Sequence, residues 1–317
     1  GTAGNAVFAE AAQANINVGN KSYVLLRPQS GKSWVLILAN PQDKFYVGSM
    51  SYDFSVDNFN DLFTNKTLTN VTALLSAMPM TAGVVVNAPP FVNKMLPMSY
   101  LYEATEGINV NTKIGTSTVP LELTRAVAKI VVKSTVADFT LSGIHSVYNM
   151  NKNTVLHNLS GNLETAASMV DYIRNDANED FVSATANVTD PIYVYEAKSG
   201  TGAYMIIRAF YKGLESYYKI AIADDELKYI DIKRNHEYRF TIISANFPGF
   251  GSYTDALLAE PNNLALKCKV EIIDLSSFEI KANSEYYLAV SNRLCMIYDD
   301  INSEHQYLAF TLTTNCT

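Results

Sequence analysis

Cysteine, histidine and tryptophan are scarce in this chain. Its 317 residues include three cysteines, four histidines and one tryptophan. The cysteines lack the close spacing of a four-ligand zinc site. No two histidines lie four residues apart, the spacing that places two ligands on one face of a helix. The sequence therefore predicts no metal-binding residues.

The three cysteines also do not form a disulfide framework, which needs an even set. Cys268 alternates with the apolar residues Leu264, Leu266, Val270 and Ile272 on the predicted inward face of a strand. It is interpreted as a small buried apolar residue. Cys295 and Cys316 leave two alternatives open. They form one bridge that closes the C-terminal segment, or they remain two thiols.

Long apolar runs and clusters of positive charge are absent as well. No run reaches the roughly 18 apolar residues of a membrane-spanning helix, and the first residues lack the basic and apolar regions of a signal peptide. The formal net charge is −7, and the 24 lysines and arginines are scattered. Because phosphate backbones and anionic membranes attract basic patches, we expect no nucleic-acid partner and no direct membrane partner.

Motifs of nucleotide-binding and hydrolytic enzymes are incomplete. Gly31-Lys32-Ser33 resembles the end of a phosphate-binding loop, but Leu26 stands where that loop needs its first glycine. No Gly-x-Ser-x-Gly motif is present. The acidic clusters at 224–226 and 299–300 are interpreted as solvated turns. We therefore predict that the protein is not an enzyme, has no catalytic residue and binds no cofactor.

The abundant residue types favour β-strands. The chain has 20 tyrosines and many valines, isoleucines and threonines. Strand-like runs separated by turn residues recur throughout. These runs are Tyr23–Leu26, Trp34–Ala39, Gly83–Val86, Phe139–Tyr148, Ile192–Tyr195, Ala203–Tyr211, Tyr217–Ala223, His236–Ala245 and Leu264–Asp274. The pattern predicts an all-β fold built of β-sandwiches.

In the run Leu264–Asp274, successive side chains are expected to point to opposite faces of the sheet. The inward face is predicted to carry Leu264, Leu266, Val270 and Ile272, and the outward face Lys267, Lys269 and Glu271.

Two segments have apolar residues at helical spacing, Val56–Met78 and Asn162–Arg174, and are predicted to be short helices that cap or flank a sandwich. The Gly- and Thr-rich stretch 107–118 is the best candidate linker. We therefore predict an N-terminal sandwich domain over 1–117 and a C-terminal one over 118–317.

The stretch Val119–Lys133 is a long apolar strand whose buried face changes half-way along. Leu121 and Leu123 lie on one face, whereas Ala126, Ala128, Ile130 and Val132 lie on the other, so the alternation slips near Arg125. Either a bulge or a strand shared between two packing environments explains that slip.

Several motifs, taken in order, resemble landmarks of the fimbrillins, the pilus subunits of the Bacteroidetes type V system. Trp34 to Asn40 is similar to an N-terminal strand of that family that ends in Ala-Asn. Further matches are the Tyr218-Lys-Ile, Pro248-Gly-Phe-Gly and Ser284-Glu-Tyr-Tyr-Leu-Ala-Val segments. The motif positions that we single out are Pro97, Met98, Ser99, Arg125, Ala126, Lys129, Arg234, Asn235, His236 and Tyr238.

Membership of that family implies two transthyretin-like β-sandwiches, export as a lipoprotein precursor, and a place in a fimbrium at the cell surface or outer membrane. It also implies removal of an N-terminal strand by a protease. The hydrophobic groove left behind accepts the C-terminal strand of the next subunit, as in strand addition generally. The expected partners are other fimbrial subunits and a host or bacterial surface ligand. The only expected link to the membrane is a lipid anchor that has been removed.

The tail over about 292–317 is the candidate donor strand, with Leu308, Phe310 and Leu312 on one face. The alternative is that this tail is the last strand of its own sandwich. A second alternative concerns the whole protein, which is then a tip or accessory adhesin, or a glycan-binding module whose surface tyrosines stack on sugars.

Overall fold

The computed structural model describes residues 2–14, 16–18, 21–40, 42–80, 96–114, 121–163, 169–173, 182–183, 187–261, 265–277, 279–282, 287–290 and 312–314. Strands dominate, and the helices are short. This confirms the all-β class with short helices. Within the described residues, no helix is long and apolar enough to cross a membrane.

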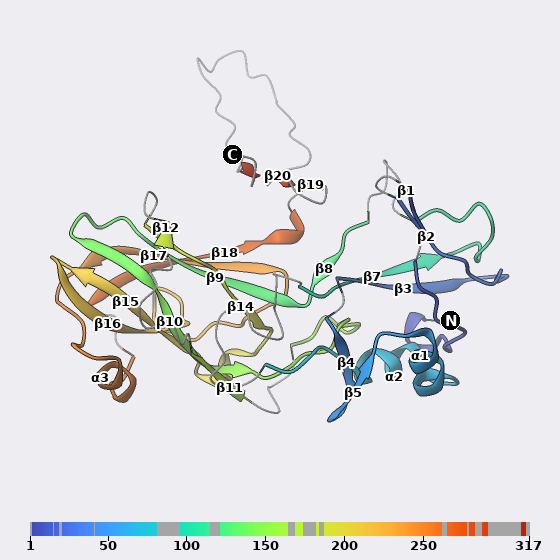
Figure 1. Cartoon of the computed structure of the whole chain (residues 1–317), viewed down its shortest axis with the longest axis horizontal. Helices are drawn as coiled ribbons and strands as arrows, with labels where there is room; N and C mark the ends of the chain where they lie inside the picture. Colours follow the sequence, from blue (N-terminus) through green and yellow to red (C-terminus); the bar gives the residue numbers. More distant parts are fainter. Residues whose placement is uncertain are drawn as a thin grey trace, which may run out of the picture.

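The N-terminal half contains two three-stranded sheets (Figure 1). One has the order β3 (Ser33–Ala39), β7 (Met98–Ala104), β8 (Thr124–Arg125). The other has the order β5 (Met50–Asp53), β4 (Lys44–Val47), β6 (Leu75–Ser76). A short hairpin joins β1 (Ile16–Val18) and β2 (Lys21–Tyr23), and η1 covers Ala3–Asn5.

Helices α1 (Val56–Phe63) and α2 (Leu68–Leu74) confirm the helical prediction over most of 56–78, although its last residues form β6 and a loop. Ser55 and Thr67 cap them, since each side chain accepts a hydrogen bond from a backbone N–H of the first turn. Phe63 and Val71 are buried in the core. The helices thus cover one side of the N-terminal half.

The C-terminal half contains two larger sheets. One has the order β12 (Val182–Ser183), β13 (Val188–Thr189), β9 (Val127–Ser134), β17 (His236–Ala245), β18 (Leu266–Asp274), with β14 (Ile192–Tyr195) also paired to β9. The other has the order β11 (Met169–Ile173), β10 (Phe139–Asn151), β15 (Tyr204–Tyr211), β16 (Leu214–Ala221). Helix α3 (Tyr253–Leu258) packs on β15 and β16.

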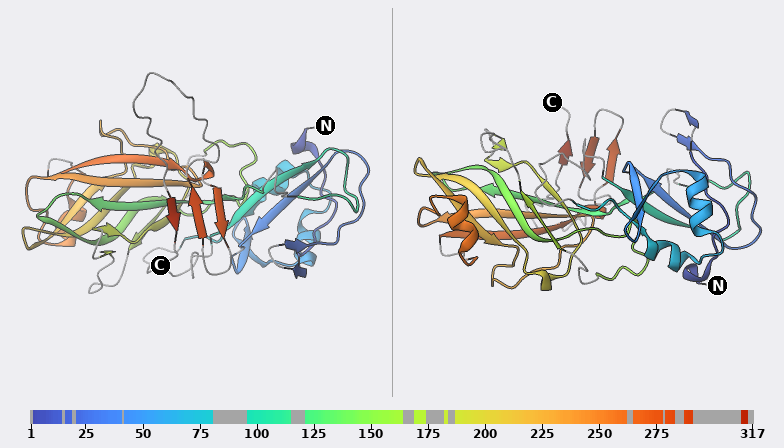
Figure 2. Two further views of the ribbon diagram at one scale, coloured as in Figure 1. Left: turned by 90° about the horizontal axis from the view of Figure 1, so that it is seen from above. Right: turned by 60° about the horizontal axis from the view of Figure 1, so that its bottom comes forward.

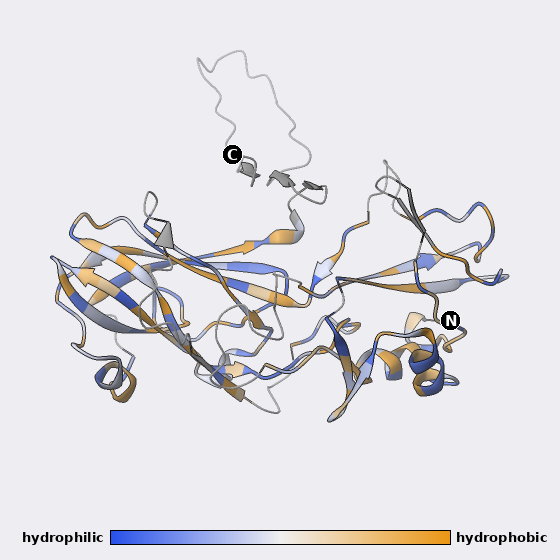
Figure 3. Cartoon of the chain, viewed as in Figure 1, coloured by the Kyte–Doolittle hydropathy of each residue, from blue (hydrophilic) through white to orange (hydrophobic). Residues whose placement is uncertain are grey.

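One apolar core joins the inner faces of these two sheets and extends into the N-terminal half. Ile130 and Phe240 enter it from one sheet, and Ile144 and Ile207 from the other; all four are fully buried. Figure 3 shows the apolar residues along β9, β10 and β15. A small sheet of β19 (Glu279–Ala282), β20 (Tyr287–Val290) and β21 (Leu312–Thr314) lies beside the middle of the molecule (Figure 2).

The described part of the 119–133 stretch, from residue 121 onward, is divided between two sheets. Thr124 and Arg125 pair with β7 in the N-terminal sheet, and Val127 begins β9 in the C-terminal sheet. The strand is therefore shared between two packing environments, one of the two explanations for its change of face. The boundary between the two domains at 117/118 and their transthyretin-like topology remain predictions.

The predicted helix over Asn162–Arg174 is wrong for residues 169–173, and residues 164–168 and 174 lie outside the described part of the chain. Residues 169–173 form strand β11, which pairs antiparallel with β10. Met169 and Asp171 are exposed and Val170 is buried, so this stretch follows the alternation of a strand. Pairing with the edge of β10 outweighs a helical spacing of apolar residues, because short apolar runs fit both patterns.

Most of the inward and outward assignments in β18 are confirmed. Leu266 is buried, Val270 is half-buried, and Lys267, Lys269 and Glu271 are exposed. Leu264 lies outside the described residues. Ile272 was wrongly assigned to the core, since it is 51% exposed. It lies opposite the fully buried Tyr238, but on the edge strand of the sheet, so one flank of its side chain has no neighbouring strand among the described residues.

Replacing Leu266 with alanine is expected to lower the free energy of unfolding by about 2–5 kcal/mol, because truncation of a buried leucine leaves a cavity. Ile272→Ala, on the same strand, is the matched control and is expected to cost under about 1 kcal/mol. Urea unfolding followed by circular dichroism measures both. A loss below about 0.5 kcal/mol at Leu266 would show that the inward face of β18 is misassigned.

Candidate functional site at the sheet crossing

The ten motif positions gather where the chain passes from the N-terminal sheet to the C-terminal sheet. Ala126 is the residue between β8 and β9, and its side chain is fully buried. Its backbone N–H donates to the carbonyl of Pro97 at 2.8 Å. Met98 pairs with Arg125, and Ser99 with Thr124. A small residue fits this bend, where two backbones lie close together.

Asn235 ties the crossing to the far end of the sequence. Its side-chain oxygen accepts from the Arg125 guanidinium at 3.1 Å and from the Arg125 N–H at 3.5 Å. Its own N–H donates to the carbonyl of Val127 at 2.8 Å. Asn235 has a φ of 57°, a left-handed conformation that asparagine tolerates better than most residues. It is buried, so its bonds hold the two segments together away from water.

Arg234 forms a buried two-pronged ion pair with Glu196, the residue that follows β14. Its Nε donates to Glu196 Oε2 at 2.8 Å, and its NH2 to Oε1 at 2.5 Å. The side chains are 11% and 9% exposed. The guanidinium also donates to the carbonyls of Val155 and Leu156, at 2.9 and 3.3 Å. Each of these bonds satisfies a buried polar group. The pair therefore holds together the end of β14, the residues before β17 and the 154–156 segment.

Ser99 and His157 extend this network toward β7. The Ser99 hydroxyl lies 3.0 Å from the carbonyl of Leu156 and 3.0 Å from His157 Nδ1. Burial lowers the pKa of His157 to about 4, and the nearby Arg234 charge adds to the effect. The hydroxyl of Ser99 is too deeply buried to meet a substrate, since the residue is 1% exposed. A structural link between the halves fits this Ser–His pair better than nucleophilic chemistry does.

Lys129 and Glu237 pair across the parallel strands β9 and β17. Lys129 Nζ lies 2.8 Å from Glu237 Oε2, and Arg239 donates to Oε1 at 2.6 and 2.9 Å. Burial raises the pKa of Glu237, but the charges of Lys129 and Arg239 outweigh it, so the pKa falls below its usual range. The pairing fixes the register of two strands that are about 108 residues apart in sequence.

The last two motif positions stabilise the turn before β17. His236 Nδ1 lies 2.7 Å from the carbonyl of Arg234. The Tyr238 hydroxyl donates to the carbonyl of Asp231 and accepts from the N–H of Lys233, both at 2.7 Å. Burial raises the pKa of Tyr238 to about 12, so the hydroxyl stays protonated and able to donate.

Sequence reasoning missed Glu196, His157 and Thr154, which complete this network. Thr154 Oγ1 donates to Glu196 Oε1 at 3.1 Å. The one available signal was a single carboxylate directly after the apolar run Ile192–Tyr195. No pattern in the sequence identifies Arg234 as the partner of Glu196.

Among the described residues, no group of three or more His, Cys, Asp and Glu lies close enough to hold a metal ion. Cys268 is a free, half-buried thiol, and burial raises its pKa to about 12. Cys295 and Cys316 lie outside the described residues.

The candidate donor residues Leu308 and Phe310 also lie outside the described residues. The backbone of Leu312 is described as part of β21, which pairs with β20 through Val290.

Solved structures that resemble this fold come from Bacteroidetes. A protein from Bacteroides eggerthii, described as a candidate cell adhesion protein, has a TM-score of 0.44 and 15% identity; the match covers 80% of this chain and 81% of that one. The tip fimbrial protein Mfa3 of Porphyromonas gingivalis has 0.43 and 16%, with 82% and 86% covered. A fimbrial assembly protein of Parabacteroides distasonis has 0.38 and 15%, with 67% and 65% covered. No family model and no curated protein sequence matches the chain.

Replacing Arg234 with methionine is expected to destabilise the protein by about 3–5 kcal/mol, because it leaves the Glu196 carboxylate buried without its charge partner. The matched control is Arg208→Met, which breaks a more exposed pair with Glu215 and should cost no more than about 1 kcal/mol. Chemical denaturation measures both. Equal losses for the two variants would contradict a special role for the buried pair.

Stability is expected to fall as the pH drops from about 6.5 toward 4. The folded state keeps His157 neutral, whereas the unfolded state binds a proton below about pH 6.5. The contribution is therefore complete above that pH and is lost across this window. His157→Gln should flatten the corresponding part of the pH–stability curve. An unchanged slope in that variant would contradict the prediction.

Proposed function

We propose that this chain is a structural subunit of a cell-surface fimbria, a type V pilus, that assembles by donor-strand exchange. The observation that carries the proposal is the convergence of the motif positions. Pro97–Ser99, Arg125–Lys129 and Arg234–Tyr238 are far apart in sequence, yet they build one connected crossing between two sheets. Chance matches would have no reason to meet. Their convergence supports the resemblance to fimbrillins and, through it, the fimbrial role.

An acceptor for a donor strand is available at β3. This strand is at one edge of its sheet, and no described strand pairs with its outer edge. Its seven residues, SWVLILA, are all half-buried and carry no charge. Leu36 and Leu38 pack against the main core. A long apolar edge of this kind is a template for another strand.

The contrast with β18 strengthens this choice of edge. β18 is also at an edge of its sheet, but Lys267, Lys269 and Glu271 lie exposed along it. Charged residues are a common means of preventing strand addition. β3 has no such protection within its bounds, so we assign it as the side that receives the next subunit.

The tail residues Leu308, Phe310 and Leu312 are the proposed donor. Burying three such side chains contributes roughly 5–9 kcal/mol, at about 1.5–3 kcal/mol each, less the entropy lost on ordering the tail. That surplus is sufficient for a long-lived contact between subunits. Other fimbrial subunits are then the partners. The location is the cell surface, reached by export as a lipoprotein precursor to the outer membrane.

A tip or accessory adhesin is the second candidate, and an aromatic cluster on the outer face of the β10–β15–β16 sheet favours it. Tyr148 stacks on Tyr204 with ring centroids 4.6 Å apart, and His145 lies 4.2 Å from Tyr253. Tyr204, His145 and Tyr253 are partly exposed. Such rings are able to stack on the apolar faces of sugars. A glycan array probed with the purified chain tests this candidate directly.

Replacing Leu308, Phe310 and Leu312 together with serine is expected to abolish incorporation into fibres while the melting temperature of the monomer stays nearly unchanged. The matched control replaces Tyr307, Ala309 and Thr311, the opposite face of the same segment, and should still assemble. Electron microscopy of fibres and calorimetry of the monomer are the measurements. If the first variant melts much lower as a monomer, the tail belongs to its own sandwich and is not the donor.

A further inference from the structure

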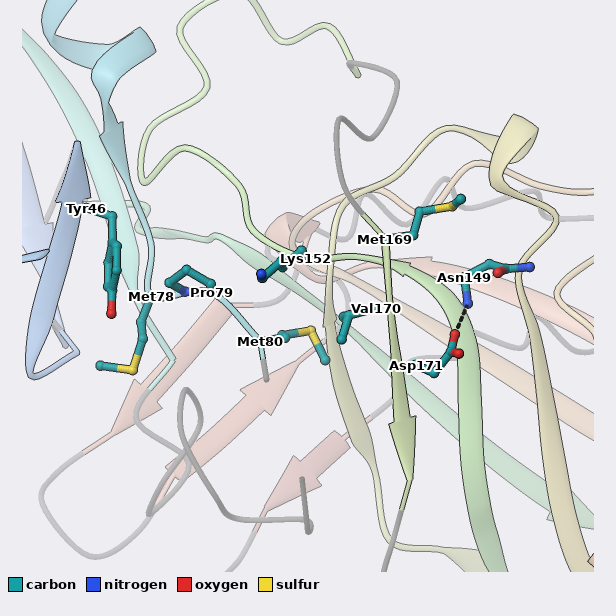
Figure 4. Close-up of a pocket in the computed structure, with 9 residues that line it drawn as sticks. All are labelled: Tyr46, Met78, Pro79, Met80, Asn149, Lys152, Met169, Val170 and Asp171. Atoms are coloured by element: carbon teal, nitrogen blue, oxygen red, sulfur yellow. Dashed lines mark hydrogen bonds between the residues drawn. The ribbon is translucent and has the colours of Figure 1, made fainter. Parts of the chain in front are cut away.

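A further surface feature lies between the two halves of the molecule. It is a cavity of about 780 Å³ lined by nine residues from four segments (Figure 4). They are Tyr46 of β4, Met78, Pro79 and Met80 after β6, Asn149 and Lys152 of the β10 region, and Met169, Val170 and Asp171 of β11. This volume is within the range of small-ligand sites, which often lie where two parts of a protein meet.

One wall of the cavity is the edge of a strand. Neighbouring residues of a strand point to opposite faces. A cavity that contacts three consecutive residues of a strand therefore lies at its edge and not on its face. Residues 169–171 meet this condition in β11, and within the described residues no strand pairs with the outer edge of β11. Residues 78–80 provide a second run of three on the facing wall.

The facing wall is held rigidly. The Met78 N–H donates to Gln42 Oε1 at 2.8 Å, and the Tyr195 hydroxyl donates to the Met78 carbonyl at 2.6 Å. The Met80 N–H donates to the Lys152 carbonyl at 2.7 Å. A wall fixed in this way loses little entropy when something binds against it.

A bulge shapes the other wall. The pairing of β10 with β11 shifts register between Val147 and Met150. Asn149, inside the bulge, has a φ of 57°, and its N–H donates to Asp171 Oδ1 at 3.2 Å. Bulges of this kind re-aim side chains beside binding sites. Here the bulge places Asp171 at the end of the cavity.

The chemistry of the lining points to a peptide. Met78, Met80 and Met169 are flexible apolar side chains that adapt to different partner residues. The edge of β11 offers backbone N–H and carbonyl groups for pairing. Tyr46 is the one aromatic side chain in the lining. The cavity therefore offers a sugar only one ring on which to stack.

Lys152 gives the site a charge preference. Its side chain is exposed at the cavity and makes no ion pair or side-chain hydrogen bond within the described part of the chain. Asp171 is the one acidic residue of the lining, and it lies at the end of the cavity beside the Asn149 N–H that donates to it. An acidic group on a ligand would complement the ammonium of Lys152.

We propose that this slot binds an extended, mainly apolar segment of a second polypeptide that carries an acidic residue opposite Lys152. The segment adds to the edge of β11, and its apolar side chains pack among the three methionines. This site is separate from the β3 edge, and the proposal does not depend on the fimbrial assignment.

The test uses three fluorescein-labelled peptides of nine residues that alternate threonine and valine, with Glu, Gln or Lys at the centre. Fluorescence anisotropy with the full chain is expected to rank them Glu, Gln, Lys in decreasing affinity. The Glu peptide should bind up to about fivefold more tightly than the Gln peptide, as expected for a partly exposed ion pair. Hydrogen exchange of the amides at 169–173 should slow when the Glu peptide is bound.

Three variants separate the contributions. Lys152→Gln should remove the preference for Glu and leave the affinity for the Gln peptide within about twofold. Lys267→Gln, an exposed lysine on β18, should change nothing. Met169→Asp should weaken all three peptides, because Met169 is 52% exposed at the slot and its replacement does not disturb the core. Melting temperatures confirm that each variant is folded.

The proposal is overturned if none of the peptides binds, which includes the case of a slot filled by another segment of this chain. It is also overturned if Lys152→Gln retains the preference for Glu, or if the exchange of 169–173 is unaffected. Fibre incorporation by Lys152→Gln should equal that of the unmodified chain, so failure here is distinguishable from failure of the fimbrial proposal.

Discussion

The backbone passage through Ala126 is the constraint on which the rest of the structure depends. One strand-like stretch serves two sheets, so the orientation of each sheet is tied to the other through a single buried bend. Such a bend exposes peptide groups that neither sheet satisfies. The Pro97 carbonyl and the Asn235 side chain supply the missing partners. Because unpaired buried peptide groups are costly, these two residues are as important to the fold as any apolar side chain.

The charged groups around the bend, like its peptide groups, need partners. Arg234, Glu196, Lys129 and Glu237 are all partly or largely desolvated, and a buried charge without a partner is expensive. A buried ion pair adds little net stability compared with apolar packing. It does impose one geometry, because a shifted strand would leave both charges unpaired. We infer that the network specifies the register of β9, β14 and β17 more than it strengthens them.

Sequence patterns predict those features that depend on neighbouring residues. The change of buried face near Arg125 was visible, because alternation is local, and the helices between 56 and 74 followed from the spacing of apolar residues. Features that depend on distant partners were not visible. Val170 became part of a strand because β10 offers an edge, and Ile272 is exposed because its edge position has no cover. Glu196 meets Arg234 across 38 residues, and no local pattern encodes that meeting.

The edge strands of this molecule differ in whether charged side chains protect them from pairing with another strand. β18 carries alternating exposed charges, whereas β3 presents seven half-buried uncharged residues, and β11 borders a methionine-lined slot. A monomer gains nothing from an apolar edge, which exposes it to unwanted pairing. The proposed strand additions therefore use β3 and β11 and leave the charged edge of β18 unpaired. The two open edges differ in chemistry, since β3 has no charge and the slot beside β11 has Lys152 and Asp171. Under the two proposals they would therefore receive different strands.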